Sequence, residues 1–180
     1  LVFATGNSAV PVEYMRLNYQ GRFGIGTAAP ASKLDVRGTV QVGVDGTGHD
    51  VIFYGAASGA SASWDETNAK WNIKGPAATP GIITLQTAET SVVDGNKLGQ
   101  IDFQAPDDSA GSDATLIAAS IWAEADATFS SSVNATELVF ATGASETAAE
   151  KMRIDSAGNV GIGIIPETIF AADTVLVLGG

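Results

Sequence analysis

Two glycine triplets are the residues best suited by type to hold a phosphate. They lie at 21–26 and 158–163, each with the spacing GxxGxG. Dinucleotide-binding loops have the spacing GxGxxG and lead into a helix whose N-terminus receives the phosphate. No helix-forming run follows either triplet. We therefore interpret these glycines as sites of close backbone approach or strand bending, where a Cβ would not fit.

Carboxylates and the single histidine suggest acid–base or metal chemistry. Asp107, Asp108 and Asp113 cluster, and paired carboxylates can cleave glycosides, but this loop is rich in Ser and Gly, as solvated turns are. His49 precedes Asp50 in the turn sequence DGTGHD, yet the DxDxDG spacing of a calcium loop is absent. We expect a non-enzyme with no catalytic residue, cofactor or metal.

Aromatic side chains could instead bind sugars. Trp64, Trp71 and Trp122 could stack on sugar rings and form a glycan platform, although tryptophans at strand positions more often lie in a core or an interface. Asn134 begins the only N-x-S/T sequon, which matters only in a glycosylating environment. We keep glycan binding as an alternative and favour packing.

Composition excludes several classes of protein. The 180 residues carry a net charge of −11, so clustered phosphate contacts and a nucleic-acid partner are not expected. There is no cysteine, and therefore no disulfide. The apolar runs are far shorter than the ~20 residues of a membrane helix. Charged residues make up 16% of the chain, against about 25% in an average domain.

The strongest signal is an internal repeat with an offset of 137 residues. Residues 1–26 return without a gap as residues 138–163, and 14 of the 26 positions are identical. A weaker echo follows each copy: a proline (Pro30, Pro166), then TVQV from Thr39 or TVLV from Thr174. We interpret the chain as one period of a tandem array with an overlap at each end. The alternative is two similar hairpins inside one closed domain.

Short alternating runs between turn residues predict an all-β chain with at most one short helix. Strands are expected within residues 34–44, 50–55, 82–87, 99–105 and 136–143, and hairpins within 60–75 and 151–163. Residues 115–127 are ambiguous, because alanine favours a helix, but the run is apolar on both alternating faces and we favour a strand. Gly75–Gly81 is the expected joint between sub-units.

Four segments in this order resemble the shaft repeats of bacteriophage tail fibres and related virion fibre proteins: LGQIDFQAPDD, LIAASIWAEAD, TELVFATG and EKMRIDSAGNVGIG. Residues 33–73 are similar to a second module that accompanies them. The most specific elements are MRIDSAGNVGIG and DVIFYG followed by WDE. The resemblance covers nearly the whole chain and implies an elongated, β-rich parallel homotrimer that carries receptor-binding tips. The usual threonine after the GIG triplet is Thr27 in the first copy but Ile164 in the second.

Association is also expected on physical grounds. Small all-β units with few large aromatics bury little apolar area alone, and the low charge fraction implies that other chains cover part of the surface. Threefold association would do so, with small residues near the axis. The residues expected at this interface are Met15, Gly24, Ile25, Gly26, Met152, Gly161, Ile162 and Gly163.

The predicted function is structural: a repeat segment of a phage-type fibre, on a virion tail or in an extracellular fibre, that gives reach and rigidity for host attachment. Its partner is itself; a host-surface glycan would bind through regions outside this chain, and neither nucleic acid nor a membrane is expected. The alternatives are a glycan-binding module and a subunit of a non-viral extracellular filament. The predicted organisation is the end of an upstream repeat unit (1–26), a β connector module (27–75), a β module ending in the MRIDSAGNVGIG hairpin (76–163) and the start of the next unit (164–180).

Overall fold

The computed structural model describes residues 1–6, 11–104, 111, 113–166 and 176–178 of the chain. These residues form strands, turns and loops, with one short 3-10 helix, η1 (Asp113–Thr115), and no α-helix among them. The all-β prediction is therefore confirmed. The chain divides into two units, Leu1–Ile82 and Ile83–Gly180. This division follows directly after the expected joint at Gly75–Gly81.

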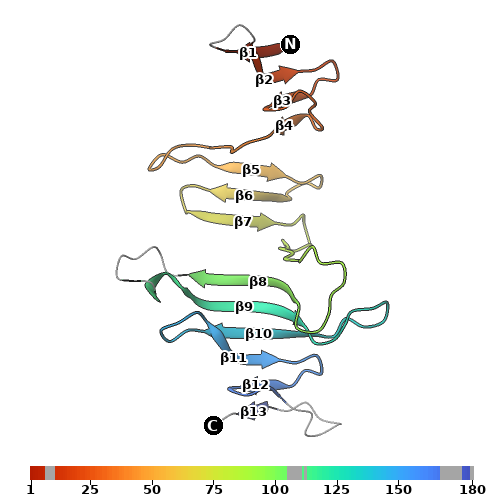
Figure 1. Cartoon of the computed structure of the whole chain (residues 1–180), viewed down its shortest axis with the longest axis vertical. Coiled ribbons are helices and arrows are strands. Elements are labelled where there is room, and N and C mark those ends of the chain that lie inside the picture. The colour runs from red at the N-terminus through yellow and green to blue at the C-terminus, as the bar shows by residue number, and fades with distance from the viewer. Residues whose placement is uncertain (7–10, 105–110, 112, 167–175, 179–180) are drawn as a thin grey trace. The chain divides into compact units, whose positions relative to one another are not determined.

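The first unit holds two sheets, whose strands follow one another in chain order (Figure 1). The four-stranded sheet consists of β1 (Val2–Thr5), β2 (Val12–Leu17), β3 (Phe23–Ile25) and β4 (Leu34–Val36). The three-stranded sheet consists of β5 (Val51–Tyr54), β6 (Ser61–Asp65) and β7 (Lys70–Lys74). All neighbours are antiparallel except β3 and β4, which are parallel. The hairpin expected within residues 60–75 is confirmed as β6–β7.

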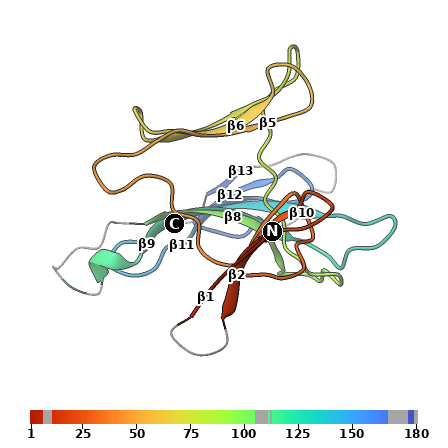
Figure 2. The same ribbon diagram turned by 90° about the horizontal axis from the view of Figure 1, so that it is seen from above.

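The second unit holds one six-stranded sheet in the order β13-β12-β11-β10-β9-β8. Its strands are β8 (Lys97–Gln104), β9 (Ile117–Ala125), β10 (Thr136–Thr142), β11 (Ala149–Ile154), β12 (Val160–Ile162) and β13 (Leu176–Leu178). The ambiguous segment 115–127 thus contains a strand. In the view from above, the strands of a sheet overlie one another, so each sheet is a single layer (Figure 2).

The two copies of the repeat have the same strand pairing. Phe3 pairs with Met15, and Phe140 pairs with Met152, each 137 residues later. After both pairs the register shifts by one residue, which makes a β-bulge at the same place. The next pairing also agrees: Met15–Ile25 and Met152–Ile162. Equal sequence constraints have therefore produced equal local structure, as register rules require.

Each copy then continues into a parallel strand. The similar segments TVQV and TVLV do not correctly predict where this strand lies in the first copy. β13 overlaps the end of the TVLV segment, but its counterpart β4 is Leu34–Val36 and not the TVQV segment. Residues 37–44 were expected to continue as a strand and do not. Arg37 N still donates to Ile25 O at 3.0 Å, but β3 ends at Ile25, so this strand offers no further pairing to the residues after Arg37.

The expected strand at residues 82–87 is also absent. This apolar run lies against β8 rather than pairing with it. A Cβ added to Gly99 would meet Leu85 O and Leu85 Cβ at 2.7 Å each. The close approach explains glycine at position 99, because a side chain there would push the segment away.

Candidate functional site

An aspartate-based turn shapes the hairpin that carries each GIG triplet. Asp155 Oδ1 accepts from the backbone N–H of Ala157 at 3.0 Å and of Asn159 at 2.8 Å. In the first copy, Asn18 Oδ1 accepts in the same way from Gln20 and Arg22, both at 3.0 Å. Such side-chain acceptors stabilise a turn without a ligand. The turn sequence predicts positive φ at Gly158 and Asn159, and the structure has it at Gly158, at 86°, but not at Asn159.

The glycines of the triplet are required by their own chain. A Cβ on Gly161 would lie 2.2 Å from Ile164 O and 2.7 Å from Pro166 Cδ, and one on Gly24 would lie 2.8 Å from Thr27 O. Both glycines are buried. The final glycines, Gly26 and Gly163, have φ of 73° and 70°. The interpretation as close backbone approach is thus correct.

The isoleucine of each GIG triplet points to the face of the sheet opposite to the buried glycine before it. Ile25 is 37% exposed and Ile162 is 42% exposed. Their strand partners Met15 and Met152 share this face, because directly paired residues lie on the same side of a sheet. Four of the eight predicted interface residues therefore share one face of their sheet, which we call the open face. Gly24 and Gly161 are buried on the opposite face, which we call the covered face.

Bulges bring a glutamate and an arginine to the covered face of each copy. Residues three apart on a regular strand point to opposite faces, but the bulge places Glu150 beside Arg153, with Oε2 and Nη2 2.5 Å apart. Glu13 and Arg16 form the same pair in the first copy. In the second copy, Arg153 also donates to Glu137, the residue that precedes the repeat.

This second cluster is the more buried of the two. The side chains of Glu137 and Arg153 are 7% and 12% exposed. Burial raises the pKa of Glu137, against the opposing effect of its bond to Arg153. Hydrogen bonds from Arg153 to Glu150 and Glu137 raise the pKa of the guanidinium, despite its burial. The sequence analysis missed this cluster, although Glu-x-x-Arg recurs at identical positions of the repeat.

Polar side chains cover the rest of this face on β8 and β9. Ser120 Oγ donates to Asp102 Oδ1 at 2.6 Å, and Gln100 Nε2 donates to the same oxygen at 2.5 Å. These two hydrogen bonds lower the pKa of Asp102. Lys97 Nζ lies 3.8 Å from the centre of the Trp122 ring. The polar groups of this face thus satisfy one another.

The opposite face of the same sheet is apolar and open. Its side chains come from adjacent strands in paired positions and include Ile101, Phe103, Ile121, Leu138, Phe140, Met152 and Ile162. Phe103 is 54% exposed and Ile101 is 50% exposed. Among the described residues, the buried hydrophobic side chains are Ala125, Val139 and Ala141, all small or on the polar side. This sheet therefore has an apolar face without a core over it.

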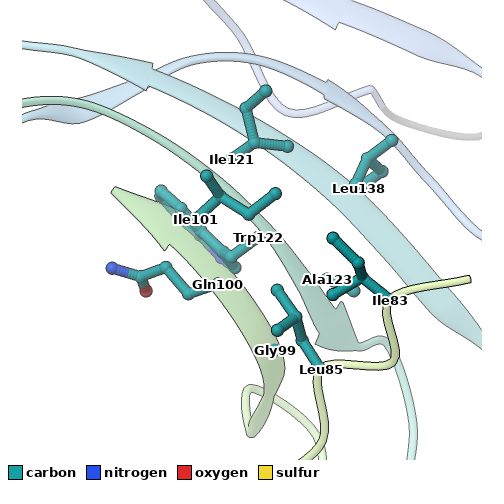
Figure 3. Close-up of a pocket in the computed structure, with 9 residues that line it drawn as sticks. All are labelled: Ile83, Leu85, Gly99, Gln100, Ile101, Ile121, Trp122, Ala123 and Leu138. Atoms are coloured by element: carbon teal, nitrogen blue, oxygen red, sulfur yellow. The ribbon is translucent and has the colours of Figure 1, made fainter. Parts of the chain in front are cut away.

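A shallow depression of about 230 Å³ lies at that face (Figure 3). Ile83 and Leu85 enter it from the segment beside β8, and Ile101, Ile121 and Leu138 line it from the sheet. No ionisable side chain belongs to its lining. The depression suits an apolar side chain rather than a reacting polar substrate.

The sheets of the first unit have the same two-sided character. In β1–β4 the exposed apolar side chains Leu1, Phe3, Leu17, Ile25 and Leu34 occupy paired positions of one face. In β5–β7 that face carries Phe53 and Trp71, each 60% exposed, together with Trp64. Each of the three sheets thus presents an open apolar face, and we treat each face by itself as a candidate site.

The structure places two of the three tryptophans side by side. Trp64 and Trp71 pair across the β6–β7 hairpin, with ring centres 5.9 Å apart and planes at 56°. Trp122 belongs to the second unit, where Lys97 covers its ring and Nε1 donates to Glu124 at 2.8 Å. A glycan platform can therefore include Trp64 and Trp71, but Trp122 is already stacked.

The remaining candidates lie on turns or outside the described residues. Asp50 accepts from the backbone N–H of Glu66 at 2.9 Å, and His49 beside it is exposed. Asp107 and Asp108 lie outside the described residues. Asn134 is exposed just before β10, and its backbone oxygen accepts from Thr136 Oγ1. Within the described part of the chain, no three His, Asp or Glu side chains gather as metal ligands would.

No protein-family model matches this chain, and no curated protein matches it significantly. Among the residues whose positions are described, no helix is long and apolar enough to cross a membrane.

Proposed function

We propose that this chain is a structural repeat segment of a homotrimeric fibre of the phage tail-fibre type. Its task is reach and rigidity for host attachment, on a virion tail or in a related extracellular fibre. The observation that carries the proposal is the open apolar face of each of the three sheets. Monomeric proteins rarely leave large contiguous apolar patches in water, and such patches mark association surfaces.

The occupant of these faces is a second and a third copy of the chain. Each sheet is one layer, so it gains a core only when another apolar layer packs against it. The negative charge of the chain disfavours an acidic partner, but identical apolar faces can meet without bringing charges together. Support for three copies comes from the resemblance of the repeat to fibre shafts. In this arrangement Ile25 and Ile162 make the contact, and the glycines beside them hold the hairpins.

Sedimentation equilibrium of the purified chain tests the proposal. Three chains of 18.3 kDa give a mass of about 55 kDa. Because the contact is apolar, the mass should persist in high salt, which screens charge pairs but not apolar burial. A chain that stays near its monomer mass at micromolar concentration contradicts the proposal.

One specific observation favours a second function, glycan binding on β5–β7. Trp71 and Phe53 are more than half exposed and lie on the same face as Trp64. Aromatic faces stack on sugar rings. Replacing Trp71 with Ala separates the two functions. A glycan-binding module loses sugar binding at unchanged mass, whereas a shaft segment loses assembly and shows no sugar binding in either form.

A further inference from the structure

We propose that Phe103 of one copy of this chain inserts into the depression on the open face of a second copy. The depression is the one lined by Ile83, Leu85, Ile101, Ile121 and Leu138, and both parts of the contact belong to the second unit. This inference rests on the proposed association of copies, and it names the side chain and the depression that make the contact.

The depression results from a change in side-chain size between neighbouring columns of the sheet. Directly paired residues of adjacent strands lie in columns on one face. One column of large side chains consists of Ile101, Ile121, Phe140, Met152 and Ile162. The next column begins with Gly99 and Ala123, which have no side chain beyond a methyl group. The face is therefore hollow at these two residues, between the isoleucines and the segment that carries Leu85 (Figure 3).

The depression fits one apolar side chain better than a small molecule. Its volume of about 230 Å³ is below the roughly 300–1,000 Å³ of pockets that bind small molecules. Its lining carries no ionisable side chain that could hold a polar ligand. A hydrocarbon side chain that enters it loses no hydrogen bond and removes apolar area from water.

Phe103 is well placed to be this side chain. It lies on the same open face and is 54% exposed. Its direct partner on β9 is Ala119, and the same column continues through Thr142 to Ala149. All three side chains are much smaller than a phenyl group, so Phe103 has little packing from its own sheet. Exposed aromatic side chains that enter a pocket of the partner are the usual anchors of an interface.

The positions of the two parts predict a contact that runs from one copy to the next. Phe103 and Gly99 are four residues apart on β8, about 13 Å along the strand, so a chain cannot fill its own depression with this side chain. In a ring of copies whose axis follows the direction of strand stacking, each β8 lies level with the β8 of its neighbour. Phe103 of each copy then reaches the depression of the next, and such a contact closes when the rotation between copies is right.

The alternative is that the copies bring their Phe103 side chains together on the axis. This arrangement would leave each depression empty. Protein interiors contain few voids larger than a water molecule, and the atoms that line a void lose their packing partners. Insertion fills the depression and buries the phenyl group at the same time, so the geometry favours insertion.

An exchange of charges across the contact tests the inference. Phe103→Lys places an ammonium in the apolar depression, and Ala123→Glu places a carboxylate on its floor. Each variant alone should weaken association at least about tenfold, because a charge excluded from water without a partner is costly. In the double variant the two charges can meet between copies, since facing sheets lie about 10 Å apart and both side chains are long. Sedimentation equilibrium should show association at least about tenfold stronger than in either single variant.

The matched control combines Phe103→Lys with Ala149→Glu. Within one chain, Ala123 and Ala149 both lie roughly 14 Å from Phe103, the first four residues along the next strand and the second three strands away. Pairing inside one chain would rescue both double variants alike, whereas insertion rescues only the pair with Ala123→Glu. Equal association of the two double variants, or single variants that associate like the natural chain, overturns the inference.

A neutral substitution gives an independent measurement. Ala123→Leu fills the depression without adding a charge, so Phe103 can no longer enter, and association should weaken by about tenfold. Ala149→Leu adds the same side chain outside the depression and should not weaken association. Circular dichroism reports whether the strands of both variants are intact.

The natural chain separates the failure of this inference from the failure of the proposed function. A natural chain that stays monomeric contradicts the proposed function, and the inference falls with it. A natural chain that associates, while Ala123→Leu associates equally well, overturns the insertion of Phe103 alone.

Discussion

At the scale of single residues, two arginines in equivalent positions of the repeat bind different numbers of carboxylates. Arg16 and Arg153 each hold a glutamate that a bulge brings to their face. Only Arg153 also neutralises a nearly buried carboxylate, Glu137. Removing one partner of a buried ion pair is costly, because the remaining charge has no water to solvate it.

We therefore predict that Arg153→Met lowers the free energy of unfolding by about 3 kcal/mol. Chemical denaturation at neutral pH measures the loss. Arg16→Met is the matched control, since Glu13 can return to water, and it should cost much less. Similar losses in the two variants would show that burial of Glu137 is not the cause.

The same variant should have a distinctive pH dependence. Burial raises the pKa of Glu137 and Arg153 opposes this rise, so loss of the arginine raises the pKa further. An acid with a raised folded-state pKa stabilises the fold below its unfolded-state pKa, and this stability is lost as pH rises through the folded value. The defect of Arg153→Met should thus shrink as pH falls from 7 toward 4. A defect that grows over this range contradicts the assignment.

Gly161 is predicted to resist even the smallest side chain. In Gly161→Ala the new Cβ would overlap Ile164 O and Pro166, and overpacking of this kind costs about 2 kcal/mol. The overlap arises within one chain, so folding of the hairpin suffers whether or not copies associate. Gly38→Ala is the control, because nothing lies within 4 Å of that position. Thermal unfolding of the two variants measures the difference.

At the scale of elements, the alternation of apolar and polar residues correctly predicted which face of a strand is apolar. It did not predict which segments pair with one another. The apolar and polar faces of β6, β8 and β10 follow directly from their period of two. Residues 37–44 and 82–87 have the same alternating or β-rich character, but no strand in the described part of the chain pairs with either segment. A strand forms only when a second segment pairs with it, and the local sequence pattern describes only the first segment.

The bulges and the Glu–Arg clusters could not be predicted from the alternation of residues, for a related reason. An extra residue in β11 leaves the sequence looking regular, yet it moves Glu150 to the face of Arg153. The glycine requirement at Gly24 and Gly161 could be predicted, because few roles demand glycine twice at one offset. That Thr27 and Ile164, each followed by a proline, crowd these glycines could not be predicted, since the contact depends on how the chain returns after the triplet.

The turn between β6 and β7 is predicted to be acid-sensitive. Asp65 accepts from Asn68 N at 3.1 Å and from its Nδ2 at 3.0 Å, and these bonds lower the pKa of the carboxyl. A lowered folded-state pKa gives stability that is present above the unfolded value and is lost as pH falls through the folded value. Asp65→Ala should lower the unfolding temperature of the hairpin at pH 7, and its difference from the natural chain should shrink at an acid pH, as the pH falls through the lowered pKa of Asp65.

Tryptophan fluorescence can follow this hairpin, because Trp64 and Trp71 flank the turn. Asp45→Ala serves as the control for the loss of one exposed carboxylate. If the two variants unfold alike at both pH values, the hydrogen bonds of Asp65 contribute nothing measurable to the turn.

At the scale of the whole molecule, the chain has well-paired strands and almost no core. Its described hydrogen bonds hold the sheets together edge to edge, and its polar faces are satisfied by their own side chains. The apolar side chains on one face of each sheet remain exposed, because no second layer packs against them. Burying such area is the main source of stability in folded proteins, at about 25 cal/mol per Å². The missing core must therefore be built between molecules if our proposal is right.

Two neighbouring residues of β5 separate this explanation from a general effect of charge. Phe53 is 60% exposed on the apolar face, and Tyr54 is 81% exposed on the opposite face. Phe53→Asp places a carboxylate where the proposed contact must exclude water, which is costly without a partner. Tyr54→Asp adds the same charge on the polar side. Sedimentation at equal concentrations should show Phe53→Asp shifted toward monomer and Tyr54→Asp unchanged. If both variants keep the mass of the natural protein, the apolar face of β5–β7 is not an association surface.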